Sequence, residues 1–227
     1  MEQYQREFIE FMVQSRALTF GDFITKSGRR TPFFINTGRY DSGAKMARLG
    51  EYYACAIERH LPGGYDALFG PAYKGIPLVV ATAMALSTQH GRDVPFIFNR
   101  KELKDHGEGG SLIGHKPCDG ERIVIVEDVT TAGTSVRDSL ALLGKAARVQ
   151  VVGLVISVDR QERGQSERSA LAELREEFGL QTFAIARLDE IIQHLHNRSF
   201  DGRVVLDDQM LKAIQDYRAQ YGAVPDR

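Results

Sequence analysis

Apolar residues recur along this chain with two spacings, one typical of buried strands and one typical of helices. The clearest strand is residues 123–126, four consecutive β-branched apolar residues that indicate burial on both faces of a parallel sheet. After it, Val136, Leu140, Leu143 and Ala147 share one face of a helix. A strand, a loop of small residues and a helix N-terminus gather unpaired backbone N–H groups, so this stretch predicts an anion-binding site.

The same two spacings place the other elements. Strands are expected at residues 18–24 and 32–36, joined as a hairpin, and at 67–69, 94–98, 149–156 and 182–186. Helices are expected from the N-terminus to about residue 18, from a cap at Asp41 or Ser42 to about residue 61, after residue 75, after a cap at Ser166, and at 189–197 and 206–220. Strands separated by helices predict an α/β fold with a mainly parallel sheet flanked by helices.

A single domain is expected for a chain of 227 residues. We expect the helix and hairpin of residues 1–40 to form a small hood over an α/β core at residues 41–190, with C-terminal helices at 191–227. The net charge of −1 gives no field for binding nucleic acid, and Cys55 and Cys118 form no C-x-x-C pair for zinc. No secretory signal and no apolar run long enough for a bilayer is visible, so we expect a cytoplasmic protein without a membrane partner.

Two carboxylates, Glu127 and Asp128, stand where the strand at residues 123–126 would leave the sheet. Carboxylates repel phosphate, so this pair is expected to face a neutral or cationic part of the same ligand, such as ribose hydroxyls or a bound cation. A loop that binds phosphate beside groups that bind a sugar predicts a ribose 5-phosphate site. The alternative is an ordinary buried strand with a solvated acidic end; neither a P-loop nor a G-x-G-x-x-G turn occurs.

Two further loops have the composition of anion-binding segments. Residues 70–75, GPAYKG, combine glycines that permit close backbone approach with the point charge of Lys74. Residues 99–110 combine several cations with three glycines, as a mobile catalytic lid requires. An ordinary Gly-Pro turn and a solvated charged loop are the respective alternatives.

These stretches resemble known signatures. The segment VIVEDVTTAGTS is similar to the phosphoribosyl pyrophosphate (PRPP) motif of type I phosphoribosyltransferases, and RKELKDHGEGG resembles the catalytic loop of the orotate phosphoribosyltransferases. Residues 26–36 resemble the orotate-contacting hood of that family, and DRQERG matches its orotate-binding loop. The resemblance runs from about residue 4 to 163, and Glu127 stands where family members often have Asp.

The resemblance implies transfer of the 5-phosphoribosyl group from PRPP to N1 of orotate, a step of pyrimidine nucleotide synthesis. Mg²⁺ is the implied cofactor, held mainly by PRPP rather than by protein ligands, and a cis peptide is implied at Ala72-Tyr73. The implied catalytic residues are Lys104, Glu127 and Asp128. PRPP would contact Lys26, Tyr73, Lys74, Arg100, Lys101, Lys104, His106, Glu127, Asp128, Val129, Thr130, Thr131, Ala132, Gly133, Thr134 and Ser135, and orotate would contact Phe34, Ile35, Thr131 and Arg160.

A homodimer with active sites shared across its interface is also implied. Arg100 and Lys101 are adjacent, so in an extended segment their side chains would serve two different sites. Three alternatives stay open at this point. The base could be a purine or another pyrimidine, the chain could be a PRPP-binding regulatory protein without catalysis, and Arg160 could form only a surface salt bridge.

Overall fold

The computed structural model describes residues 1–25, 28–62, 64–101, 111–130, 132–200 and 202–224. Its centre is a six-stranded sheet in the order β5-β4-β3-β6-β7-β8. The strands are β3 (Ala67–Gly70), β4 (Phe96–Asn99), β5 (Leu112–Gly114), β6 (Arg122–Val126), β7 (Gln150–Asp159) and β8 (Gln181–Arg187). All neighbours are parallel except β4 and β5. The expected α/β fold with a mainly parallel sheet is therefore confirmed.

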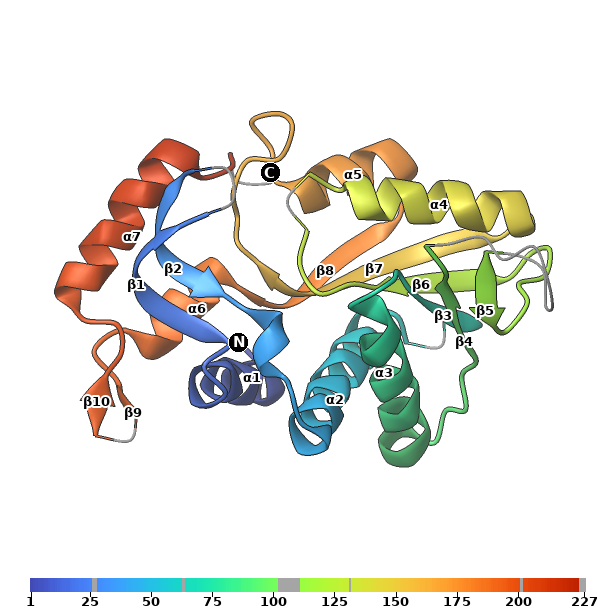
Figure 1. Ribbon diagram of the computed structural model, residues 1–227, viewed down its shortest axis with the longest axis horizontal. Coiled ribbons are helices and arrows are strands. Elements are labelled where there is room, and N and C mark those ends of the chain that lie inside the picture. The colour runs from blue at the N-terminus through green and yellow to red at the C-terminus, as the bar shows by residue number, and fades with distance from the viewer. Residues whose placement is uncertain (26–27, 63, 102–110, 131, 201, 225–227) are drawn as a thin grey trace.

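Helices cover both faces of this sheet (Figure 1). The helices are α1 (Gln3–Gln14), α2 (Gly43–His60), α3 (Gly75–His90), α4 (Thr134–Ala146), α5 (Ala170–Phe178), α6 (Leu188–Leu195) and α7 (Asp208–Tyr221). Helices α4 and α5 lie on one face, while α2 and α3 lie on the other. None of the described helices is long and apolar enough to cross a membrane.

Strand β6 is buried on both faces, which explains its unbroken apolar run. Ile123 and Ile125 are fully buried in the cluster that contains Val136 and Leu143 of α4. Val124 and Val126 are fully buried on the opposite face, in the cluster formed with α2 and α3. Since successive strand residues point to opposite faces, a strand covered on both sides needs an apolar residue at every position.

The segment outside the sheet consists of the antiparallel hairpin β1 (Leu18–Ile24) and β2 (Arg30–Ile35), followed by a short 3-10 turn, η1 (Thr37–Arg39). The C-terminal helix α7 packs against β2, although about 170 residues separate them in the chain. A short hairpin of β9 (Ser199–Phe200) and β10 (Arg203–Val204) lies between α6 and α7. Figure 1 shows the hairpin β1-β2 and α7 together at one end of the sheet.

Three local expectations were wrong. Helix α1 ends at Gln14 rather than near residue 18, because Arg16 has a positive φ of 57° that breaks the helical path. The cap of α5 is Ser169, whose side chain accepts a hydrogen bond from Ala172, whereas Ser166 donates its hydroxyl to Glu173. Residues 112–114, placed in a long loop, form the antiparallel edge strand β5, whose three residues are too short to show a period.

Candidate functional site

The site lies at the carboxyl ends of β3 and β6, which are neighbours in the sheet. From β3 the chain continues to β4 on one side, and from β6 it continues to β7 on the other. Ligands of open α/β sheets bind in the crevice where the strand order reverses in this way. The loop after β3 and the acidic loop after β6 therefore face each other across that crevice.

Asp128 is the most heavily contacted carboxylate of the crevice. Its Oδ2 accepts hydrogen bonds from Lys74 Nζ at 2.6 Å and from Thr37 Oγ1 at 2.8 Å. Burial raises the pKa of the Asp128 carboxyl, but the charge of Lys74 and the hydrogen bonds from Lys74, Thr37 and the Val129 backbone together outweigh it, so the pKa lies below its ordinary value. Asp128 is thus ionised at neutral pH and paired with a lysine whose side chain remains 63% exposed.

The pKa of Glu127 is shifted in the opposite direction. Burial raises the pKa of its carboxyl to about 7, although Asp128 N and Ser135 Oγ donate hydrogen bonds to it at 3.0 and 2.7 Å. The hydroxyl of Tyr53, fully buried on α2, donates to the Glu127 carbonyl oxygen at 2.7 Å. Tyr53 therefore ties the acidic loop to the helix layer beneath the sheet.

The loop after the acidic pair turns into the N-terminus of α4. Gly133 precedes the helix with a positive φ of 72°, and its N–H donates to Thr130 Oγ1 at 3.2 Å. Arg137 of α4 reaches back to the carbonyl of Ala132 at 2.7 Å and also pairs with Glu177 of α5. The backbone N–H groups of this helix start are therefore presented by a loop that is braced from behind, as phosphate binding requires.

The loop after β3 is closed tightly on itself. A Cβ at Gly70 would overlap the carbonyl of Gly75, so the two glycines allow the backbone to double back before α3. The peptide Ala72-Tyr73 is cis, as the resemblance implied, and Ala72 N donates to Asn99 Oδ1 at 2.7 Å. Lys101 lies over the exposed ring of Tyr73 at 4.9 Å.

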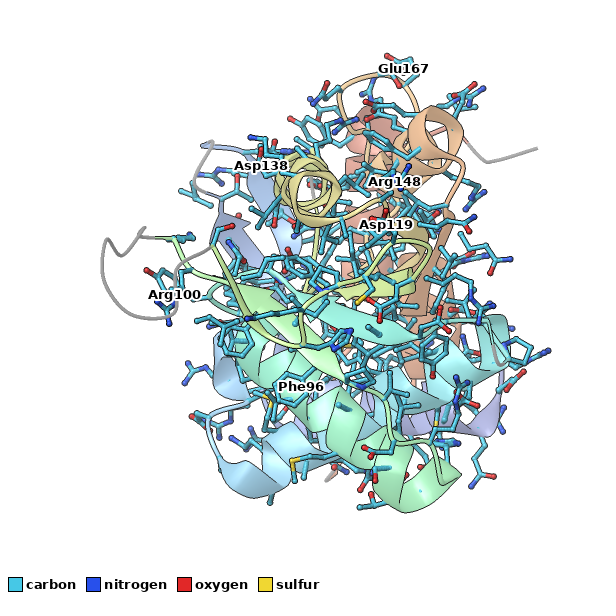
Figure 2. All side chains as sticks on the ribbon, turned by 90° about the vertical axis from the view of Figure 1, so that its right-hand side faces the viewer. Phe96, Arg100, Asp119, Asp138, Arg148 and Glu167 are labelled. Carbon is cyan, nitrogen blue, oxygen red and sulfur yellow. The ribbon has the colours of Figure 1, made fainter. Side chains whose placement is uncertain are left out.

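A groove of about 510 Å³ continues from this loop along α4. Arg100 and Lys101 contribute cations to it, and Thr134, Ser135 and Asp138 contribute polar groups from α4. Figure 2 shows Arg100 and Asp138 projecting on the same side of the molecule. The groove therefore joins the β3 loop to the phosphate loop.

The third group of the site follows β7. Arg160 donates to Glu162 Oε1 from Nε at 2.9 Å and from Nη2 at 2.6 Å. Its guanidinium also lies 4.8 Å from the ring centre of Phe33, which is fully buried on β2. Thr130 of the phosphate loop and Arg160 line one small cavity of about 30 Å³. Arg160 does form an ion pair, as the surface salt-bridge alternative predicts, but the side chains of Arg160 and Glu162 are largely buried rather than at the surface.

Most residues that the sequence singled out lie on three neighbouring loops, after β3, β6 and β7. Lys26, Lys104, His106 and Thr131 lie outside the described residues, and so do residues 102–110 of the proposed lid. Phe34 is partly exposed and packs against Phe23 across the hairpin, whereas its neighbour Phe33 is the ring beneath Arg160.

Sequence reasoning missed Thr37, Tyr53 and Asn99. Thr37 contacts both Asp128 and Lys74, yet it lies in a turn with no motif of its own. Tyr53 lies among the buried apolar residues of α2, and a tyrosine there gives no sign that its hydroxyl reaches a strand end. The Asn99 contact joins the last residue of β4 to Ala72, 27 residues earlier in the chain, and only the pairing of β3 with β4 brings the two together.

Comparison with known proteins gives a consistent result. A family model for the phosphoribosyl transferase domain matches residues 36–185. An orotate phosphoribosyltransferase of Lachnoclostridium phytofermentans is 54% identical over 98% of this chain and 99% of its own length. Another, of Thioalkalivibrio sulfidiphilus, is 49% identical over 98% of this chain and 100% of its own. The crystal structure of the Francisella tularensis orotate phosphoribosyltransferase superposes with a TM-score of 0.82 at 35% identity, covering 96% of this chain and 100% of that one.

Proposed function

The chain belongs to the orotate phosphoribosyltransferase family, and we propose that it transfers the 5-phosphoribosyl group of PRPP to N1 of orotate, giving orotidine 5′-phosphate and pyrophosphate. One observation carries the proposal: the acidic pair Glu127-Asp128 stands between the braced N-terminus of α4 and the lysine of the β3 loop. The helix N-terminus suits the 5′-phosphate, and the carboxylates suit the ribose hydroxyls.

Lys74 links the two halves of the reaction. Its ammonium group pairs with Asp128, where ribose hydroxyls would bind. Once those hydroxyls donate to Asp128, the exposed lysine can turn toward the pyrophosphate. The sugar develops oxocarbenium character as the anomeric bond breaks, so the carboxylates stabilise the cation while Lys74, Arg100 and Lys101 stabilise the departing anion.

Mg²⁺ is the proposed cofactor. Within the described part of the chain, no three His, Cys, Asp or Glu residues are arranged to hold a metal ion. Asp128 Oδ2 and Glu127 Oε2 already accept hydrogen bonds from protein groups. This donor set suits an ion carried by the oxygens of PRPP, where it neutralises charge on the leaving group.

Arg160 is the proposed contact for orotate. The base carries a carboxylate at neutral pH, which an arginine binds bidentately. Adenine, hypoxanthine and uracil have no such group, so a buried arginine at the base site favours orotate over them. A regulatory protein that only binds PRPP would need neither this arginine nor the catalytic cations.

We also propose a cytoplasmic homodimer with shared active sites. The support is the family resemblance and the lid sequence at residues 99–110. In the single chain, Arg100 and Lys101 both line the groove beside their own β3 loop, so the alternation of their side chains alone does not require a second subunit. Both substrates are charged and do not cross a membrane unaided, which supports a cytoplasmic location.

An absorbance assay tests the proposed reaction directly. Purified protein with PRPP and Mg²⁺ should consume orotate and leave adenine, hypoxanthine and uracil unchanged. Arg160→Ala should raise the KM for orotate by about tenfold or more while the KM for PRPP stays within about twofold, because a charge-assisted bidentate contact is lost. Turnover of another base instead of orotate, or PRPP binding without turnover, would replace the proposal by one of its alternatives.

A further inference from the structure

The ion pair of Arg160 and Glu162 is part of a larger buried cluster. Glu162 Oε1 accepts the two bonds from Arg160 and a third from the Tyr217 hydroxyl at 2.9 Å. Its Oε2 lies 3.4 Å from Nη1 of Arg29, which also lies 3.4 Å from the Tyr217 oxygen. Tyr217 belongs to α7, so the C-terminal helix contacts the carboxylate that holds Arg160.

The backbone makes the same connection. Glu162 and Gly222 form an antiparallel bridge, in which Arg163 N donates to Tyr221 O at 3.0 Å and Ala223 N donates to Gln161 O at 2.9 Å. The loop that carries Arg160 is thus paired with residues 221–224, which are the last residue of α7 and the three that follow it. Gln161 itself has a positive φ of 55°, a conformation that a non-glycine residue holds only where its surroundings favour it.

This arrangement leaves Arg160 equipped for a second anion. A guanidinium has five N–H groups, and Glu162 binds only its Nε and Nη2 edge. No described residue accepts a hydrogen bond from Nη1, so the Nη1-Nη2 edge keeps its capacity for a carboxylate. The adjoining cavity is lined by three arginines and two acidic residues.

Stability alone does not explain such a cluster. Buried ion pairs contribute little net stability, because desolvation of the two charges offsets their attraction. What the cluster does supply is orientation, since Phe33 lies beneath the guanidinium and Glu162 holds one of its edges. Tyr217 packs edge-on against the same Phe33 ring, with ring centres 5.9 Å apart.

We propose that α7 and residues 221–224 are a positioning brace, which acts through Tyr217 and Glu162 to orient Arg160 toward the carboxylate of the base. The proposal rests on the proposed function, because it takes Arg160 as the residue that binds that carboxylate. Glu162 and Tyr217 are positioning residues and contact no substrate themselves.

Tyr217→Phe is the test variant, because it removes one hydroxyl and keeps the packed ring. Tyr221→Phe is the matched control: it lies one turn further along α7, and no described residue hydrogen-bonds to its hydroxyl. Binding is measured by calorimetry with orotidine 5′-phosphate and with ribose 5-phosphate, which lacks the base. Both ligands keep the phosphate contact, so binding stays measurable in weakened variants.

Tyr217→Phe should weaken orotidine 5′-phosphate binding about three- to tenfold, the scale of one hydrogen bond to a charged group shared with another partner. Ribose 5-phosphate binding should stay within about twofold, and Tyr221→Phe should change neither. In an Arg160→Ala background the Tyr217→Phe effect should disappear, because two residues that act through one contact are coupled. Glu162→Gln should show the same selectivity with a larger loss.

Equal losses for both ligands, or losses that add in the Arg160→Ala background, would overturn the brace and leave α7 a general stabilising element. Failure of the proposed function looks different. Wild-type protein would then not convert orotate, or Arg160→Ala would bind orotidine 5′-phosphate normally, whatever Tyr217→Phe does. Either of those results removes the residue that the brace positions and overturns both proposals.

Discussion

Glu127 and Asp128 are adjacent carboxyl groups whose pKa values are shifted in opposite directions. Asp128 accepts hydrogen bonds from a lysine and a threonine, whereas Glu127 accepts them from a serine hydroxyl and a backbone N–H. Two titratable groups with different environments take different roles at one pH. Asp128 is therefore the carboxylate most directly available to a developing cation.

Asp128→Asn should lower kcat by about 100-fold or more, because a fixed charge that stabilises the transition state is lost. The melting temperature should change by only a few degrees, since Lys74 is exposed enough to be solvated when its partner is neutral. Turnover and thermal unfolding are measured on the same preparation. Near-wild-type turnover would remove Asp128 from the mechanism, and gross unfolding would show a structural role instead.

The raised pKa of Glu127 predicts how the free energy of unfolding depends on pH. Its pKa rises from 4.5 to about 7 on folding, so in that window the folded chain binds a proton that the unfolded chain has released. The contribution to stability is fully present below the unfolded value and is lost as pH rises through about 7. Glu127→Gln, which keeps the uncharged form at every pH, should remove this loss. Denaturant unfolding of both proteins at about pH 5 and pH 8 measures it, and parallel pH dependence of the two would contradict the shift.

Among the elements, the turn from β3 into α3 positions Lys74. Gly70 and Gly75 are in such close contact that only glycine fits at either position. Gly70→Ala should therefore destabilise the fold by about 2 kcal/mol or more, through overpacking against backbone that cannot move aside. Urea unfolding measures the loss.

Gly144→Ala is the matched control for that turn. Gly144 lies on the exposed side of α4, and a Cβ there would meet nothing within 4 Å. Alanine should stabilise this helix by about 0.5–1 kcal/mol, because glycine is a poor helix former. If both variants are destabilised alike, tight packing at Gly70 is not the cause.

Elements with a clear period were predictable, and short ones were not. The strand at residues 18–24 was expected with the bounds that β1 has, and β6 was expected within one residue. Three-residue β5 and two-residue β9 and β10 are too short for a pattern and are defined by their partners. Ser166, the expected cap of α5, donates its hydroxyl to Glu173 instead, and Ser169 three residues later caps the helix.

For the whole molecule, mixing two inactive variants tests whether one subunit completes the site of another. Asp128→Asn removes the carboxylate proposed to bind the ribose, and Lys104→Ala removes a cation of the proposed lid. In a mixed dimer with shared sites, one site carries both defects and the other carries neither, so activity should return to about a quarter of the wild-type value when random exchange gives half mixed dimers.

Native mass spectrometry checks that mixed dimers have formed. If each lid serves its own subunit, every site keeps one defect and the mixture stays inactive. Absence of recovered activity in the presence of mixed dimers would therefore reject the shared site.

The sequence by itself determined the layers of this protein and the chemistry of its loops. Strand and helix periods are local properties, so they identify the α/β alternation, the acidic pair and the small-residue loop without a partner. The resemblance of four short motifs to one enzyme family was equally visible in the chain alone.

Only the tertiary structure decided which side chains meet. The order of β3 and β6 in the sheet brings Lys74 to Asp128, and the packing of η1 against these loops adds Thr37. Tyr217 reaches Glu162 from a helix 55 residues further along the chain, because α7 folds back onto the hairpin of the first 40 residues. Contacts of this kind depend on where whole elements pack, and no local period encodes that.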